Sequence, residues 1–117
     1  MTLKRNHSGP RLSASVQHGN LIFLSGQTPV NNTDDIVLQT REVLQKIDTL
    51  LTEAGSDNQH LLSAQIWLKN LGRDFQRFND EWVKWLADGN TPARATVQAE
   101  MARPEILVEI MVTAAKA

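Results

Sequence analysis

Two charged residues near the end of the chain have the side chains and the placement that small-molecule chemistry needs. Arg94 stands at the start of the alternating run "ARATVQAE", two residues after Pro92, and Glu109 lies within "EILVEIMVTAA". Both fall on the less apolar side of their runs. Because the two runs are consecutive strands, antiparallel pairing is expected, which would make Arg94 and Glu109 near cross-strand neighbours. Such a pair is either an ordinary surface ion pair, or an arginine fork for an anionic substrate beside a carboxylate that handles a proton or a water.

The segment "FLSGQ" is a second candidate, because it places Ser25 and Gly26 at the end of a predicted strand. A glycine there can expose backbone N–H groups and let a ligand approach closely. Ser25 as a nucleophile would need a base. The three histidines lie in three separate segments without the spacing of metal ligands, so no metal site is expected. The chain has no cysteine, which excludes disulfides, cysteine nucleophiles and thiolate metal sites.

The composition predicts one ordinary globular domain over residues 1–117, in which the polar residues 1–10, with Gly9 and Pro10, are expected to be loose. A formal net charge of −1 argues against a large nucleic-acid-binding surface. No run approaches the roughly 18 apolar residues of a membrane span, and the N-terminal residues lack the apolar segment of a signal peptide. A cytoplasmic protein that binds neither nucleic acid nor membrane is therefore expected.

Hydrophobic periodicity and turn residues predict the elements that must position these side chains. Two strands should form a hairpin around Gly19 and Asn20, and a helix over 34–54 should be capped by Asn32 or Thr33 and end at Gly55. The remaining elements are expected as a strand in 60–70, a helix over 73–87 with an aromatic stripe, and strands near 93–100 and 106–115.

The order β-β-α-β-α-β-β predicts an α+β fold with two amphipathic helices on one face of a mostly antiparallel sheet. In the strand within 60–70, the core face should carry Leu62, Ala64, Ile66 and Leu68. The opposite face is expected to carry Trp67, Leu107 and Met111 beside Gln65, Thr96, Glu109 and Thr113. Because so mixed a face would leave apolar area in water, we expect it to pack against other subunits, with a site between chains.

The blocks "GNLIFLSGQTPV", "EAGS", "FNDEWVKWL" and "PARATVQAE…VEIMVTAA" together resemble the RidA (YjgF) family of reactive intermediate deaminases. The resemblance extends from about Leu12 to Ala115, and the residues in these blocks are closer to those of the short YoaB-like members. It implies a chorismate-mutase-like fold and a homotrimer with three intersubunit clefts. The implied activity, that of a 2-iminobutanoate/2-iminopropanoate deaminase, hydrolyses 2-aminoacrylate and similar enamines or imines to 2-keto acids and ammonia. No metal and no organic cofactor is implied.

The resemblance also implies roles for individual residues. Arg94 matches the arginine that binds the substrate carboxylate, and Glu109 matches the glutamate that positions or activates a water. Gly26 and Thr96 match positions whose backbone lines the pocket, and Ser25 belongs to the same loop as Gly26.

The chain departs from the family pattern at Leu12, which stands where the archetypal deaminase has a tyrosine. Because leucine cannot donate a hydrogen bond, the substrate can differ or deaminase activity can be lost. The alternative function is therefore a non-catalytic trimer that binds small carboxylates or has a regulatory role. Ribonuclease activity, often attached to the family's names, is disfavoured by the net charge and by the lack of a histidine pair or a basic stripe.

Overall fold

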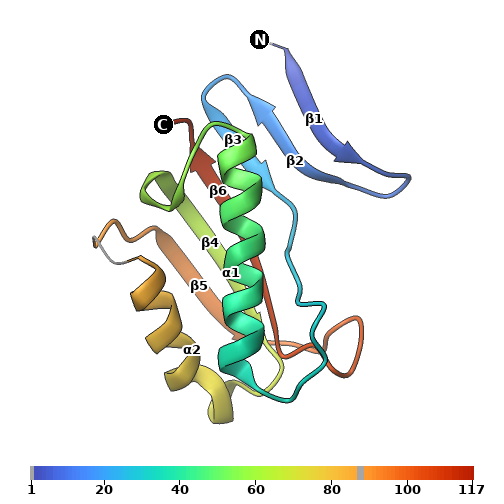
Figure 1. The fold of residues 1–117 in the computed structure, drawn as a ribbon, viewed down its shortest axis with the longest axis vertical. Coiled ribbons are helices and arrows are strands. Elements are labelled where there is room, and N and C mark those ends of the chain that lie inside the picture. Colours follow the sequence, from blue (N-terminus) through green and yellow to red (C-terminus); the bar gives the residue numbers. More distant parts are fainter. Residues whose placement is uncertain (1, 87–88) are drawn as a thin grey trace.

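The computed structural model describes residues 2–86 and 89–117 as a six-stranded sheet with two long helices (Figure 1). The elements are β1 (Leu3–Ser8), β2 (Ser13–His18), β3 (Leu21–Leu24), α1 (Ile36–Glu53), the 3-10 turn η1 (Asn58–His60), β4 (Leu61–Leu68), α2 (Leu71–Trp85), β5 (Ala93–Gln98) and β6 (Val108–Ala115). The predicted hairpin is confirmed as β2 and β3, joined by Gly19 and Asn20.

The sheet has the order β1-β2-β3-β6-β4-β5, and every neighbouring pair is antiparallel except β4 and β5. Both α1 and α2 lie on the same face of this sheet (Figure 1). The predicted α+β architecture, with two helices on one face of a mostly antiparallel sheet, is therefore confirmed. No helix among the described residues has the length and apolarity that a bilayer crossing requires.

The expected pairing of the last two strands is wrong, because β4 lies between them. Arg94 of β5 is in register with Ala64 of β4, whereas Glu109 of β6 is in register with Trp67. The cause is the connection through α2, which returns the chain parallel to β4 at the outer edge of the sheet. Residues 99–107 then carry the chain past the end of β4 to its other side.

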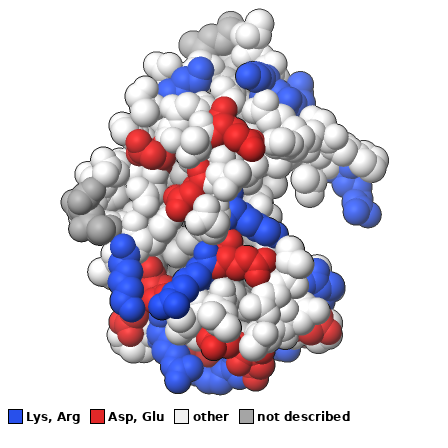
Figure 2. Space-filling view, viewed as in Figure 1, with Lys and Arg blue, Asp and Glu red and all other residues white. Residues whose placement is uncertain are grey.

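The expectation that residues 1–10 are loose is also wrong, since β1 pairs with β2 along residues 3–8. Side chains reinforce this pairing: Asn6 Nδ2 donates to Ser15 Oγ at 2.9 Å, and His7 Nε2 lies 2.7 Å from Glu53 Oε2 on α1. Because β1 is polar on both faces, it lacks the alternation by which a strand is recognised. The resulting hairpin projects beyond α1 (Figures 1 and 2).

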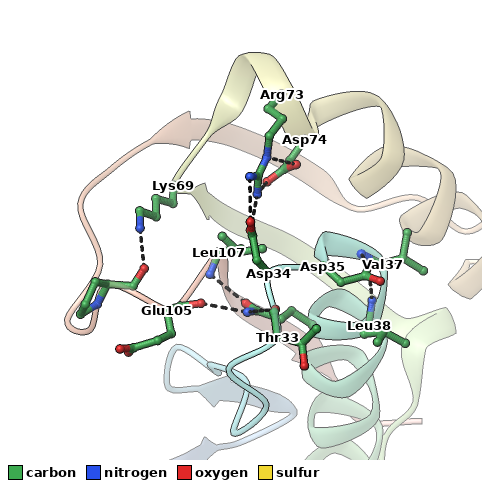
Figure 3. A network of polar contacts seen from close by, with 12 residues as sticks. Thr33, Asp34, Asp35, Val37, Leu38, Lys69, Arg73, Asp74, Glu105 and Leu107 are labelled. Atoms are coloured by element: carbon green, nitrogen blue, oxygen red, sulfur yellow. Dashed lines mark hydrogen bonds and ion pairs between the residues drawn. The ribbon is translucent and has the colours of Figure 1, made fainter.

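Helix α1 begins two residues later than predicted. Asp35, whose backbone is extended, is the N-cap, and its Oδ1 accepts hydrogen bonds from the N–H groups of Val37 at 2.9 Å and Leu38 at 3.2 Å (Figure 3). The predicted caps Asn32 and Thr33 are therefore wrong. Gly55 follows the helix with φ of +84°, as predicted, a conformation that favours glycine.

Helix α2 is fixed against the loop before α1 by one arginine. Arg73 donates to Asp74, which is buried, and reaches across to Asp34 at 2.9 Å (Figure 3). This contact joins the first turn of α2 to the entrance of α1. The helix ends at Trp85, and the predicted last residue, Ala87, lies outside the described residues.

The helix-facing side of the sheet forms the core, and the other side is uncovered. Trp67, Gln65, Met111, Glu109 and Thr113 lie on the uncovered side as predicted. Two members of the predicted set are wrong: Leu107 is buried, and Thr96 is in register with the buried Ile66, which places it on the helix-facing side. Leu62 is exposed rather than buried, because an irregularity in β4 places Leu61 in the core instead.

A buried glutamine anchors the segment that passes β4. Gln39 of α1 is fully buried, and its Nε2 donates to the carbonyl oxygens of Thr33 and Glu105, both at 2.9 Å. Its Oε1 accepts from the Leu107 N–H at 2.8 Å. One side chain therefore satisfies three backbone groups that have no strand partner, and it ties the approach to β6 onto the start of α1.

Replacing Gln39→Ala should leave the buried N–H of Leu107 without a partner and remove the hydrogen bond to the Glu105 carbonyl. We expect the free energy of unfolding to fall by roughly 2 kcal/mol or more. Urea denaturation would measure this loss. The matched control is Gln45→Ala, at an exposed position of the same helix, which should change stability little. Equal losses in the two variants would contradict the anchoring role.

Candidate functional site

Gly26 and Glu109 are in direct contact, although they are far apart in the sequence. The segment after β3 runs beside β6: the Gln27 N–H donates to the Ile110 carbonyl at 2.8 Å, and the Ile110 N–H donates to the Gln27 carbonyl at 3.1 Å. A Cβ at Gly26 would overlap Glu109 Oε2. Only a residue without a side chain therefore leaves room for the Glu109 carboxylate in this position.

Ser25 is held by β2 rather than set free. Its N–H donates to the Ala14 carbonyl at 2.9 Å, its Oγ lies 3.4 Å from the same oxygen, and Gln27 Nε2 donates to the Ser25 carbonyl at 3.0 Å. The Gly26 N–H has no hydrogen-bond partner within the described residues. Hydrogen bonds of Ser25 and Gln27 thus fix the loop on both sides of Gly26. The free N–H of Gly26 is held beside the Glu109 carboxylate.

Glu109 is a half-buried acid on the uncovered face of the sheet. Within residues 2–86 and 89–117, no basic side chain forms an ion pair with it and no donor forms a hydrogen bond to its carboxylate. Burial raises the pKa of Glu109 above that of an ordinary glutamate. Such a carboxylate accepts a proton more readily than an exposed one, which suits a group that handles a proton or a water.

Arg94 faces α2, on the other side of the sheet from Glu109. Its Nη1 donates to Asn79 Oδ1 at 2.9 Å. Its Cζ lies 5.8 Å from the ring centroid of Trp82 and 6.0 Å from those of Phe75 and Phe78. No acidic side chain among the described residues pairs with it. Partial burial lowers the pKa of Arg94, but an arginine remains cationic at neutral pH.

The expected Arg94–Glu109 neighbourhood does not exist within one chain. The residues are separated by two strand spacings and by three residues of register, which puts their Cα atoms roughly 14 Å apart. Their side chains leave the sheet on opposite faces. The interpretation of Arg94 and Glu109 as an ordinary surface ion pair is therefore wrong. Within one chain neither charge is compensated by the other.

Thr96 adds a backbone donor to the strand that carries Arg94. The Ala99 N–H donates to the Leu68 carbonyl of β4 at 3.1 Å. Because donors alternate in direction along a strand, the Thr96 N–H points away from β4, to the free edge of the sheet. The Thr96 hydroxyl is buried without a hydrogen-bond partner.

Leu12 lies at the edge of the sheet opposite to the one that carries Arg94. It is in the turn between β1 and β2, is 60% exposed, and its carbonyl accepts from the Gly9 N–H at 2.8 Å. That hairpin forms one edge of the sheet and β5 forms the other. The predicted site residues thus divide into three groups: Ser25, Gly26 and Glu109; Arg94 and Thr96; and Leu12.

Sequence reasoning missed the surroundings of Arg94. Phe75, Phe78, Asn79 and Trp82 follow the i, i+3, i+4, i+7 spacing of one helix face. A polar residue inside an otherwise aromatic stripe was the available signal. Periodicity could place the stripe against the sheet, but not identify which strand residue it would meet.

A family model described as Endoribonuclease L-PSP matches residues 4–116 of the chain. A RutC family protein of Haemophilus influenzae is 38% identical over 115 residues, covering 97% of this chain and 98% of the relative. The chain therefore belongs to this family, as its resemblance to RidA (YjgF) proteins predicted.

Relatives within the family support the predicted nearness to its short members. The RutC family protein YoaB of Escherichia coli is 36% identical over 115 residues, covering 98% of this chain and 99% of that protein. The crystal structure of a YjgF family member from Neisseria meningitidis superposes with a TM-score of 0.95 at 45% identity, covering 100% and 97% of the two chains.

The raised pKa of Glu109 generates a testable stability difference. Between the ordinary glutamate pKa and the raised one, the folded chain binds more protons than the unfolded chain, so stability falls as pH rises through this window. Glu109→Gln should therefore be more stable than the native protein at pH 7. The gain should vanish in acid, below the ordinary pKa.

Chemical denaturation at a series of pH values would measure this difference. The control is Glu100→Gln, at an exposed carboxylate beyond β5, which should leave stability unchanged. A loss of stability in Glu109→Gln at pH 7 would show that the ionised carboxylate is favoured by the fold, contrary to the burial argument.

Proposed function

We propose that the protein is an enamine and imine deaminase that hydrolyses 2-aminoacrylate-like intermediates to 2-keto acids and ammonia, in clefts between the copies of a homotrimer. One observation carries the proposal. An arginine without an acidic partner and a half-buried glutamate without a basic partner occupy separate parts of one chain. Both become useful if a second copy brings the two groups together.

The surfaces that a second copy would cover support this assembly. The uncovered face of the sheet exposes Phe23, Met111 and Val97, each more than 40% exposed. The two edges of the sheet differ, since one is the β1–β2 hairpin and the other is β5. Because the edges differ, one edge of a copy can pair with the other edge of the next, a head-to-tail contact that forms a ring where the rotation between copies closes. In such a ring Arg94 and Thr96 of one copy face Gly26 and Glu109 of the next.

The substrate is held by its carboxylate. The planar guanidinium of Arg94 matches two carboxylate oxygens, and the N–H groups of Thr96 and Gly26 supply further donors. The electrophilic carbon of the substrate then lies on the side of Glu109. Binding at one end thus orients the reacting end, which lowers the entropic cost of the reaction.

Hydrolysis needs one proton acceptor and one water. The enamine first takes a proton on its methylene carbon and becomes the iminium ion. Glu109 accepts a proton from a water as the oxygen bonds to the iminium carbon, and it returns that proton to the nitrogen, which is then a leaving ammonia. The carbon–nitrogen bond then breaks, the hydroxyl proton is lost as the carbonyl forms, and the products are a 2-keto acid and ammonia.

The second candidate is a trimer that binds small carboxylates without turnover. Leu12 favours it, because an exposed leucine stands where a hydroxyl would otherwise reach a ligand. The two candidates share the Arg94 site and differ only in catalysis. Binding of 2-ketobutyrate, measured by calorimetry, combined with an absence of imine hydrolysis would identify the second.

Cleavage of RNA is not proposed, although the family's description names an endoribonuclease. The net charge is −1, and on the face shown in Figure 2 basic and acidic side chains are interspersed. His7 is paired with Glu53 and His60 with Asp57, so neither faces the other as an acid–base pair. Imine hydrolysis uses the groups that the site does contain.

Arg94→Ala should lose imine hydrolysis by about 100-fold or more, because it removes the charged donors for the substrate carboxylate. The measurement couples a dehydratase that releases 2-aminoacrylate to the purified protein and follows 2-keto acid formation above the spontaneous rate. Arg94→Lys keeps the charge but not the planar fork, so it should restore only part of the rate.

The control is Arg77→Ala, at an exposed position of α2, which should keep the native rate. Native-like hydrolysis by Arg94→Ala would contradict the assignment of Arg94 to the substrate carboxylate. Loss of activity in the control as well would trace the effect to net charge or folding.

A mixing experiment tests the shared site. Arg94→Ala and Glu109→Ala should each be inactive, but random mixing of their subunits in trimers recreates intact sites between copies. About one quarter of the sites should recover, because an intact site needs a subunit that keeps Arg94 on one side and a subunit that keeps Glu109 on the other. The mixture is unfolded, refolded together and assayed. If activity stays at the level of the separate variants, the site lies within one chain.

A further inference from the structure

We propose that Asn79 is the positioning residue of the carboxylate site, because its neutral amide fixes the Arg94 guanidinium without cancelling the charge that a substrate carboxylate needs. This inference rests on the proposed function and extends it to a residue outside the site described so far. Asn79 sets the orientation of the Arg94 guanidinium and its affinity for a carboxylate.

The geometry of Arg94 requires a directional contact. Three aromatic rings of α2 lie about 6 Å from its Cζ, at the outer limit of a cation–π interaction. Contacts of this kind attract the cation but fix no orientation of the fork. The 2.9 Å hydrogen bond from Nη1 to Asn79 Oδ1 is the one directional contact of the guanidinium within the described residues.

That hydrogen bond leaves most of the fork free. A guanidinium offers several N–H donors in one plane, and Asn79 uses a donor on Nη1 only. The remaining donors can meet both oxygens of a carboxylate. Asn79 is itself half-buried on α2, whose first turn is fixed by Arg73, so the acceptor is held by a rigid element.

The neutrality of Asn79 is the second part of the inference. An aspartate at this position would have nearly the same shape and would accept the same hydrogen bond. It would also form an ion pair with Arg94 and so compete with the substrate for the guanidinium. An amide avoids this competition, and other arginines of the chain show the contrast: Arg41 and Arg73 are each paired with carboxylates.

The first measurement is made on the free protein. Arginine side-chain NMR spectra at low temperature report whether the Nη groups rotate freely, and Arg94→Lys assigns the signals by their disappearance. We expect slowed rotation of the Arg94 Nη1 group in the native protein and in Asn79→Asp, and free rotation in Asn79→Ala. Unchanged Arg94 signals in Asn79→Ala would overturn the positioning role.

The second measurement is the affinity for 2-ketobutyrate, taken by calorimetry. Asn79→Ala should weaken binding about three- to tenfold, since one hydrogen bond is lost. Asn79→Asp should weaken it further, by more than about tenfold at neutral pH. The loss in Asn79→Asp should shrink only well below the ordinary pKa of aspartate, because the ion pair with Arg94 lowers the pKa of the new carboxyl.

The matched control is Gln76→Glu, which adds the same charge to the same helix. Gln76 is exposed and its amide donates to Asp80, not to Arg94. This variant should bind like the native protein, and all variants should keep the native melting temperature within a few degrees.

Binding by Asn79→Asp as tight as by Asn79→Ala, or an equal loss in Gln76→Glu, would overturn the charge argument. If the native protein binds no 2-ketobutyrate and hydrolyses no imine, the proposed function fails by itself. The NMR comparison then still decides whether Asn79 fixes Arg94.

Discussion

The central position of β4 is the constraint on which the rest of the structure depends. This strand pairs in parallel with β5 and antiparallel with β6, so it separates two strands that are consecutive in the chain. The separation sets the register and the face of every residue on both sides. It directs Arg94 toward α2 and Glu109 toward the uncovered face, and it prevents the two charges from neutralising one another.

Much of the fold could be predicted from the sequence, because its helices and strands have clear periodicity. The aromatic stripe of α2 and the alternation of β6 each encode one buried face. The pairing of strands is different, since it depends on contacts between distant segments. Residues 99–107 are long enough to pass β4, and nothing in their composition indicates that they do. Strand β1 was missed for the opposite reason, because its pairing relies on backbone bonds and not on apolar side chains.

The candidate site was predictable in its residue types but not in its arrangement. Arg94, Glu109 and Gly26 were selected because their chemistry stands out in strands and at strand ends. The closeness of Gly26 to Glu109 needed the bridge between Gln27 and Ile110, which no local pattern encodes. Asn79 lies in the aromatic stripe of α2, whose other members pack against the sheet. Its contact with Arg94 could not be predicted without the strand order.

The stacking of a cation near Trp82 has an optical consequence. A positive charge over an indole ring shifts the energy of its excited state, and Arg94 Cζ lies 5.8 Å from this ring centroid. Any event that draws the guanidinium away from α2 changes the field at the indole and therefore its emission. The fold thus places an intrinsic fluorophore beside an arginine that has no acidic partner among the described residues, so the occupancy of that arginine can be followed by tryptophan emission without a label.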